Sequence, residues 1–445
     1  MNRNKLTICL LLFAACATAN NWPSFRGRNG DGIGSGKLPS TWNVKTGENI
    51  RWKKRVPGLA ISSPVIWGNR LFLTTAAGSQ TNPEFKHDST WGYRILREKD
   101  EWHFKTLCLN KSNGEQIWEA TAFVGKPKQG RHSESTYANP TPATDGTNLV
   151  VSFGSHGIYC YGIAGKLRWK RDLGPLSGAP SDNKTLDWGY SSSPIIHEGK
   201  VILQCDTPLR AFIAVLDIRD GKELFSINRR GTTTWSTPSI ARNEQRTLII
   251  CNGHKNASAF DLASGERIWW LSGRGDIPVP RPIIHGKTVI LTAAHGGRGI
   301  HAVDLNATGE LTPTPGSAVL PRGLKWWSAR KGSYIPTPLA HDGIIYVAAE
   351  NGIVTALDSK TGTQHYQERL NARRGGMAYG SPVTDSERVY IPQNDGKIHV
   401  IATGPQFKKI ATNQMGESSM ATPAISSGNL YIRTRHHLYC ISESI

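Results

Sequence analysis

The sequence has few features of a membrane-spanning or disulfide-bonded protein. Beyond residue 19, no apolar run is long enough to cross a bilayer as a helix. Five of the seven cysteines lie beyond residue 19, and an odd number at irregular spacing defines no disulfide framework. These five fall inside strand-like runs, which predicts buried free thiols. Cys205 and Cys251, in neighbouring repeats, are the one pair for which a bridge is worth testing.

The sequence also lacks every complete catalytic motif that we sought. His-Glu-x-x-His, Gly-x-Ser-x-Gly and a full P-loop are absent. The glycines of Gly30-Asp-Gly32-Ile-Gly34 lack the spacing and the preceding strand of a dinucleotide fingerprint. We therefore predict no catalytic residue and no metal site from motifs.

Acidic residues are scarce compared with basic ones. The chain has 34 Asp and Glu against 53 Lys and Arg, a formal charge of +19. This balance favours acidic partners. Because the chain is predicted to be exported, we expect an envelope protein, an acidic polysaccharide or an anionic surface as the partner, and no nucleic acid. We expect the protein to be a monomer.

The first 19 residues have the pattern of a secretory signal. Arg3 and Lys5 precede an apolar run, and Ala17-Thr18-Ala19 suits a cleavage site. The mature protein is then secreted or periplasmic. A lipoprotein anchored through Cys16 is the alternative, although Phe13 suits that cleavage motif poorly.

A repeat of about 44 residues runs through the rest of the chain. Each unit opens with Ser-Pro or Thr-Pro, and Arg281-Pro282 is a degenerate copy. A β-branched run, a third strand, a turn glycine and an aromatic four residues later complete the unit. Four short strands at this period indicate the blades of a β-propeller, and the aromatic is expected to pack between adjacent blades.

The ends of the repeat predict how the ring closes. Residues 49–56 resemble a fourth strand without its first three, whereas residues 422–441 supply three strands without a fourth. Joining them hides two open edges. We predict an all-β fold with a single propeller of eight four-stranded antiparallel blades at 49–445, completed by the N-terminal strand. Residues 20–48 form an arm, 75–105 an insertion in the first blade, and 311–337 a long connection after the fourth strand of the fifth repeat.

The repeat motif resembles a known family. AFDLASGERIW at 259–269 and ALDSKTGTQHY at 356–366 are similar to the docking motif of pyrroloquinoline quinone (PQQ)-like β-propellers. The opening NWPSFRGRNGDGIG looks like that of secreted bacterial members of unassigned role, and the family includes the lipoprotein of the β-barrel assembly machinery. The resemblance implies the fold and leaves function open.

The family also includes quinone-dependent alcohol dehydrogenases. Their adjacent cysteines are absent here, although Trp235 could serve as the tryptophan beneath a quinone. Our interpretation is a non-catalytic binding or scaffold module in the cell envelope, without a cofactor. The alternative is a PQQ-dependent enzyme with an atypical site, for which PQQ and calcium would be the cofactors.

A candidate ligand site follows from the propeller geometry. Residues just before each innermost strand should surround one mouth of the central channel, where aromatic groups offer stacking surfaces and nearby arginines suit anionic groups. The candidates are Asn139, Tyr190, Trp235, Arg281, Tyr334, Arg373, Arg374 and Tyr379. The competing interpretation is that the aromatics fill the channel and the basic groups are solvated.

Overall fold

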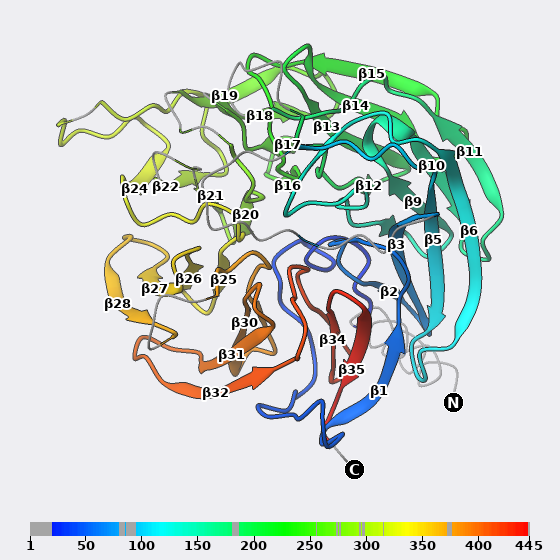
Figure 1. Ribbon diagram of the computed structural model, residues 1–445. Helices are drawn as coiled ribbons and strands as arrows, with labels where there is room; N and C mark the ends of the chain where they lie inside the picture. Colours follow the sequence, from blue (N-terminus) through cyan, green and yellow to red (C-terminus); the bar gives the residue numbers. More distant parts are fainter. Residues whose placement is uncertain are drawn as a thin grey trace, which may run out of the picture.

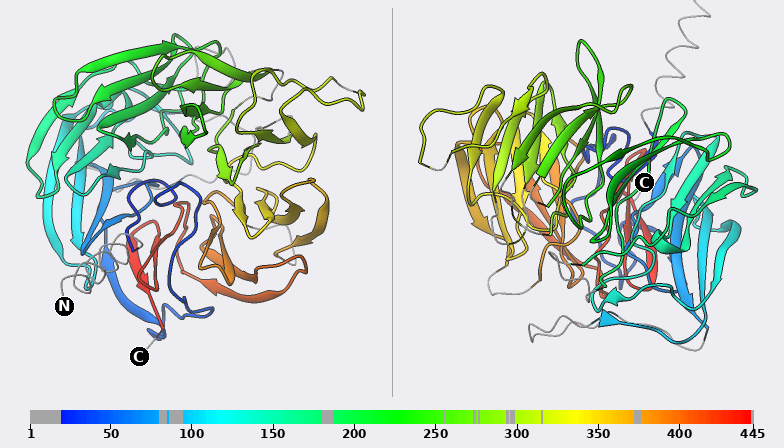
Figure 2. Two further views of the ribbon diagram at one scale, coloured as in Figure 1. Left: turned by 180° about the vertical axis from the view of Figure 1, so that it is seen from behind. Right: turned by 90° about the horizontal axis from the view of Figure 1, so that it is seen from above.

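The computed structural model shows a ring of eight sheets around a central axis (Figure 1). It describes residues 20–79, 85, 95–179, 187–254, 256–272, 275, 277–292, 295, 299–314, 316–371 and 376–443. The signal segment with Cys16, much of the predicted insertion, and Arg373 and Arg374 lie outside these ranges. Seen from the side, the ring is a thick disc, and connecting loops project from its two faces (Figure 2).

The first four blades follow the chain in order, each with its first strand nearest the axis. Blade 1 is β2 (Val65–Trp67), β3 (Arg70–Gly78), β5 (Trp102–Asn110) and β6 (Gln116–Gly125). Blade 2 is β8 (Ala143–Thr144), β9 (Asn148–Ser152), β10 (Ile158–Gly162) and β11 (Leu167–Arg171). Blade 3 is β12 (Ile195–His197), β13 (Lys200–Asp206), β14 (Ala211–Asp217) and β15 (Glu223–Asn228). Blade 4 is β16 (Ser239–Arg242), β17 (Thr247–Cys251), β18 (Asn256–Asp261) and β19 (Arg267–Ser272).

The last four blades repeat the pattern. Blade 5 is β20 (Ile283–His285), β21 (Thr288–Thr292), β22 (Ile300–Asp304) and β24 (Leu324–Ser328). Blade 6 is β25 (Leu339–His341), β26 (Ile344–Ala348), β27 (Ile353–Asp358) and β28 (Gln364–Arg369). Blade 7 is β29 (Val383–Thr384), β30 (Arg388–Pro392), β31 (Lys397–Ala402) and β32 (Lys409–Gln414). Blade 8 is β33 (Ala424–Ser426), β34 (Asn429–Arg433), β35 (His437–Ile441) and β1 (Ile50–Arg55).

The closure predicted from the sequence is confirmed. β1 pairs antiparallel with β35, from Ile50 opposite Ile441 to Arg55 opposite His437. Blade 8 therefore joins the two ends of the repeat and leaves neither with an open edge. The remaining small elements are the two-stranded antiparallel sheet of β4 (Ile95–Leu96) and β7 (Arg131–His132) and the helical turn η1 (Gly154–His156).

Blade 5 differs from the prediction. The fourth strand was expected before residue 311, but β23 (Gly309–Glu310) instead pairs parallel with β19 of blade 4, and β24 completes blade 5. The position four residues after Gly309 is Pro313, so no docking aromatic is available there. Trp326 in β24 supplies that aromatic group, which explains why β24 takes the outer position.

Burial separates the middle strands of each blade from its outermost strand. Strands such as β17 (TLIIC) and β30 (RVYIP) are buried at almost every residue because neighbouring blades cover both faces. Outer strands are more exposed: β1 alternates between half-buried and exposed residues, whereas β11 and β28 each bury a single aromatic residue, Trp169 and Tyr366. The outermost strand of a blade therefore contacts its neighbours through fewer side chains than the middle strands do.

Outer-strand tryptophans hold adjacent blades together. Their indole N–H groups donate to carbonyl oxygens in the turn between the third and fourth strands of the next blade. The bonds join Trp52 to Lys111 at 3.1 Å, Trp118 to Ile163 at 3.2 Å, Trp169 to Ile218 at 2.8 Å and Trp326 to Ser359 at 3.0 Å. The turn glycine lies directly under the indole. A Cβ atom at Gly221 would lie 2.6 Å from the Trp169 ring.

Gly221→Ala should therefore cost more than its backbone strain alone. Both Gly221 (φ 72°) and Gly343 (φ 76°) have positive φ, but Gly343 has open space where a Cβ atom would stand. We expect Gly221→Ala to lower the free energy of unfolding by about 1–3 kcal/mol more than Gly343→Ala, because only the first displaces an indole. Urea unfolding of the two variants measures the difference, and equal values would contradict the docking contact.

The Ser-Pro and Thr-Pro repeats also have a structural role. In six of the eight repeats, the N–H of the residue before the proline donates to the equivalent hydroxyl of the next blade at 2.9–3.0 Å. The bonds join Ser63 to Thr141, Thr141 to Ser193, Ser193 to Thr237, Arg281 to Thr337, Thr337 to Ser381 and Ser381 to Thr422. Arg281 replaces the Ser or Thr of the repeat and has no hydroxyl, so its side chain does not accept this hydrogen bond from the preceding blade.

Candidate functional site

The arm, residues 20–48, begins inside the ring and then runs outward, where Ser40 and Trp42 bond to Asn413 of β32, the outermost strand of blade 7. In Figure 1 it is the dark blue trace in the middle of the ring, leading out to β1. Trp22 exchanges two main-chain hydrogen bonds with Ile66 of β2, at 2.9 and 2.8 Å, and Thr384 of β29 bonds to Gly32 and Gly34, both at 2.9 Å. The arm therefore adds to the innermost strands as a further strand would.

Arg26 fixes the arm to two blades. Its side chain is completely buried, and its guanidinium donates to five carbonyl oxygens at 2.8–3.4 Å: those of Gly30, Asp31, Thr337, Pro338 and Pro382. Burial lowers the pKa of Arg26 to about 9, an effect that Asp31 opposes and Arg281 adds to. At neutral pH the group is still charged, and the carbonyl dipoles compensate it.

Arg281 contacts the same arm. Its Nε donates to Ser239 Oγ at 2.9 Å and its Nη1 to the Phe25 carbonyl oxygen at 2.8 Å. The Gly30 backbone packs so closely that a Cβ atom there would lie 2.1 Å from the guanidinium carbon. Burial lowers the pKa of Arg281 to about 10, and Asp31 opposes that change. Arg281 thus acts with the arm rather than with the other predicted site residues.

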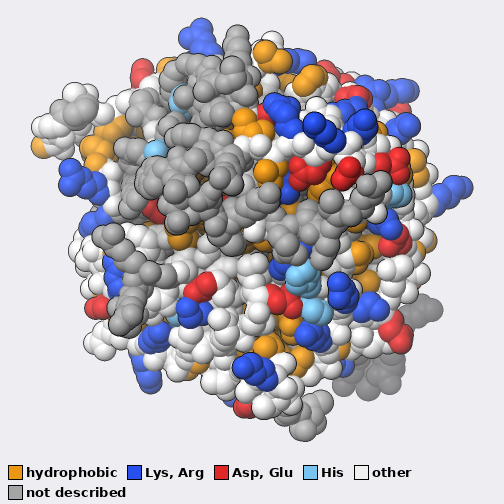
Figure 3. Space-filling model, in the orientation of Figure 1, with side chains coloured by type: hydrophobic (Ala, Val, Ile, Leu, Met, Phe, Trp, Pro, Cys, Tyr) orange, Lys and Arg blue, Asp and Glu red, His pale blue; other side chains and the backbone are white. Residues whose placement is uncertain are grey.

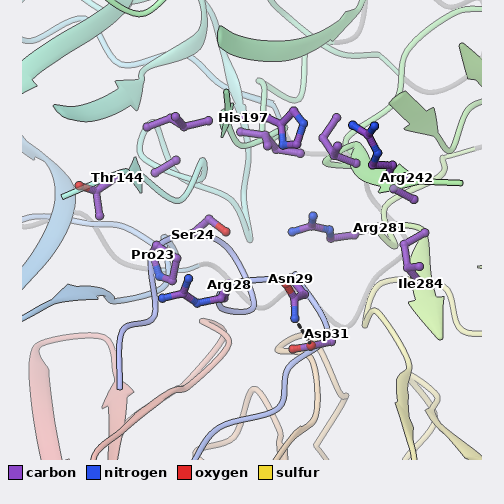
Figure 4. Close-up of a pocket in the computed structure, with 15 residues that line it drawn as sticks. Pro23, Ser24, Arg28, Asn29, Asp31, Thr144, His197, Arg242, Arg281 and Ile284 are labelled. Carbon is purple, nitrogen blue, oxygen red and sulfur yellow. Dashed lines mark hydrogen bonds between the residues drawn. The ribbon is translucent and has the colours of Figure 1, made fainter. Parts of the chain in front are cut away.

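A cavity of about 410 Å³ lies between the arm and the innermost strands of blades 2 to 5. Figure 4 shows Arg281 extending into the space between them, with Arg28 and Asp31 on the arm and Arg242 beyond. The apolar part of its wall comes mainly from isoleucines of three neighbouring blades, Ile195, Ile196, Ile240 and Ile284. The sequence analysis missed this cavity, although the arginine in place of a repeat hydroxyl at position 281 marked the site as unusual.

The predicted aromatic residues at the other mouth are engaged with their own surroundings. The Tyr190 hydroxyl donates to the Gln204 carbonyl at 2.9 Å, and Trp235 Nε1 donates to the Gly189 carbonyl at 3.0 Å. Trp188 packs on Trp235 with ring centroids 5.9 Å apart, and Tyr334 packs against the same cluster. The Asn139 amide donates to Ser135 Oγ at 2.8 Å and to the Tyr190 carbonyl at 3.2 Å.

Residues 126–139 reach across this mouth. Tyr379 of the seventh repeat donates its hydroxyl to Glu134 at 2.8 Å, and Arg131 pairs with Glu98 at 2.7 Å. Burial raises the pKa of Tyr379 above its ordinary range, and the Glu134 carboxylate adds to the increase. Tyr379 therefore has a carboxylate as its nearest charged neighbour. The structure brings together Asn139 with Tyr190 and Trp235 with Tyr334, while Arg281 lies by the arm.

A buried histidine lies beneath this connection. His156 Nε2 accepts the Lys128 N–H at 2.9 Å, so the proton is on Nδ1, which faces the Phe153 carbonyl at 3.1 Å. Burial lowers the pKa of His156 to about 4. The neutral ring is thus the form that the fold accommodates.

We expect acid to destabilise the protein through this group. The unfolded pKa is about 6.5 and the folded one about 4, so the stabilising contribution is complete above pH 6.5. It is lost as the pH falls from there through 4. His156→Gln should reduce the loss of unfolding free energy over this window by about 2–3 kcal/mol. Urea unfolding at several pH values measures it, with His103→Gln, a more exposed histidine, as control. An unchanged pH dependence would contradict the assignment.

Metal and thiol chemistry have little support in the described residues. No group of three or more His, Cys, Asp or Glu that could hold a metal occurs within them. The five cysteines, including Cys205 and Cys251, are free and buried, as the sequence predicted. Burial raises the pKa of the Cys251 thiol to about 12, which keeps it protonated and unreactive at neutral pH.

The ring of eight blades, the indole-to-turn contacts and the repeat motif define a PQQ-like β-propeller. A family model described as "Outer membrane protein assembly factor BamB" matches residues 104–317 and 323–444. The chain belongs to this family.

Individual relatives are distant. An outer membrane protein assembly factor BamB from Moranella endobia (strain PCIT) is 22% identical over 407 residues, 77% of this chain and 94% of that protein. The crystal structure of BamB from Moraxella catarrhalis superposes with a TM-score of 0.54 at 15% identity, covering 78% of this chain and 96% of that one. A europium-containing methanol dehydrogenase reaches 0.62 at 10% identity, covering 97% of this chain and 100% of that one. The structural likenesses at this identity establish the fold alone.

Proposed function

We propose that the mature chain is a non-catalytic scaffold of the cell envelope that binds a partner protein, in the assembly of outer membrane proteins. The observation that carries the proposal is that the chain fills its own axis. The arm occupies the channel with Arg26 at its centre, and residues 126–139 reach across the other mouth. This leaves little of the axis open for a cofactor, and the relatives named as assembly factors support the partner class.

The envelope location is part of the same proposal. No helix among the described residues is long and apolar enough to span a bilayer. The sequence of the first 19 residues supports export, with Cys16 as a possible lipid anchor. Mass spectrometry of the mature N-terminus distinguishes the two forms, because cleavage after Ala19 and acylation at Cys16 give different masses.

An anionic polysaccharide or membrane surface is a less supported partner. On the face shown in Figure 3, acidic side chains lie among the basic ones, so the positive excess does not form one uniform field there. The predicted site residue Tyr379 has the Glu134 carboxylate as a hydrogen-bond partner, which disfavours an anion beside it. Among the described candidates, only Arg281 lines a cavity with other arginines.

The alternative of a PQQ-dependent enzyme meets residues that do not fit the group. A quinone stacked on Trp235 would need an open ring face, but Trp235 is almost fully buried and packs beside Trp188. The five cysteines stand in five different blades, so none can form an adjacent pair over a quinone. We assign no catalytic step to the chain.

Two measurements on the purified mature chain test the proposal. Co-elution with the purified β-barrel assembly protein of the same organism in size-exclusion chromatography is the expected result. Titration with PQQ and calcium should leave the melting temperature unchanged. A saturable increase in melting temperature together with dye-linked alcohol oxidation would overturn the proposal in favour of the enzyme.

A further inference from the structure

The arm covers the inner strands of only part of the ring. It pairs with β2 through Trp22 and with β29 through Gly32 and Gly34, and the Pro23 carbonyl accepts the Thr144 N–H of β8 at 2.8 Å. At blade 8, the Ser35 carbonyl accepts the Gly428 N–H at 3.2 Å. The cavity described above lies beside blades 3, 4 and 5, whose innermost strands the arm does not cover.

The register shows what these three blades present to the cavity. Ile66 precedes the pair Trp67–Arg70 that closes the first hairpin of blade 1, and its N–H and C=O both bond to the arm. Ile196 and Ile284 occupy the same position before the pairs His197–Lys200 and His285–Thr288. Because N–H and C=O groups alternate in direction along a strand, the main chain of Ile196 and Ile284 also faces the axis.

The side chains around this inner edge are of two kinds, apolar and cationic. Ile196, Ile240 and Ile284 are all half-buried and line the cavity. Arg28, Arg242 and Arg281 line it too, and Asp31 is the only carboxylate among the lining residues. Arg28 and Arg242 lie on different sides of Arg281 in Figure 4. The cavity therefore has an excess of positive charge spread along its length.

We propose that this cavity binds a short, extended, acidic segment of a partner protein. The segment adds to the inner edges of β12 and β20 by main-chain hydrogen bonds, as the arm adds to β2 and β29. Its alternate side chains lie on opposite faces, so apolar residues contact the isoleucines while carboxylates meet the arginines. Arginine forks match carboxylate geometry, and strand addition is a general mode of peptide recognition.

The proposal rests on the proposed function only in that the partner is a protein. A small organic anion would use the arginines but not the main-chain groups of Ile196 and Ile284. The two possibilities therefore differ in their need for peptide N–H groups.

The test uses the mature chain and a fluorescein-labelled, end-blocked peptide of alternating valine and glutamate, followed by fluorescence anisotropy. We expect saturable binding that weakens with salt and no binding of the matched valine–lysine peptide. Arg242→Glu should weaken binding about tenfold or more, whereas Arg171→Glu, an exposed arginine on β11, should leave it unchanged. Melting curves establish that both variants are folded.

A peptide methylated on alternate main-chain nitrogens tests the strand addition. It retains its charges, and we expect it to lose binding. The proposal is overturned if the parent peptide shows no saturable binding or if the methylated peptide binds equally well. It is also overturned if hexyl phosphate displaces the labelled peptide as effectively as unlabelled peptide does, or if Arg242→Glu and Arg171→Glu have equal effects. Co-elution with the assembly protein is scored separately, so a failed site leaves the scaffold proposal standing.

Discussion

A chain that lacks residues 20–56 should lose the cooperative thermal unfolding of the mature protein. The deletion removes β1, which closes blade 8 against β35, and with it the Trp52 contact to Lys111 of blade 1. It also removes Trp22 and Trp42, whose side chains are buried in the core. Loss of one such aromatic group costs about 3–5 kcal/mol, so the sum is comparable to the whole stability of a typical domain, about 5–15 kcal/mol.

Differential scanning calorimetry of the mature chain and two truncations separates strand from arm. The chain without residues 20–48 keeps β1, so we expect a cooperative but lower transition. The chain without residues 20–56 should show a broad transition or none, and a synthetic peptide of residues 20–56 added in trans should restore part of it. Equal cooperativity in the longer truncation would mean that β1 does not close the ring.

Arg26→Ala should be among the most destabilising single substitutions. It removes the donor group for five carbonyl oxygens and opens a void beside Gly32 of the arm. Each buried polar group left without a partner costs about 1–3 kcal/mol, although water entering the void would offset part of this. We expect the free energy of unfolding to fall by about 3–5 kcal/mol, measured by urea unfolding.

Arg26→Lys and Arg51→Ala are the matched controls. An ammonium group has three donors and no planar fork, so lysine should recover only part of the loss. Arg51 is exposed on β1 of the same N-terminal region, and its removal should change stability by less than about 0.5 kcal/mol. Similar values for Arg26→Ala and Arg51→Ala would show that the carbonyl contacts contribute nothing.

The sequence determined the architecture because the information is local and repeated. Each unit carries its turn glycine, its β-branched strand and its docking aromatic within about 44 residues, and the split repeat predicted the pairing of β1 with β35. The predicted position of the fourth strand of blade 5 was wrong because the local signal is missing there. No aromatic residue lies four positions after Gly309, and the chain continues to Trp326 before it completes the sheet.

The contents of the channel were decided by tertiary structure alone. Arg26 meets Pro338 and Pro382, which are 312 and 356 residues away, and Arg281 meets Phe25 across 256 residues. No periodicity links such positions, because the arm belongs to no repeat and its glycines fit whatever path the eight inner strands leave open. The sequence therefore specified the ring, and only the folded chain showed that the arm occupies its axis and leaves a cationic cavity beside blades 3 to 5.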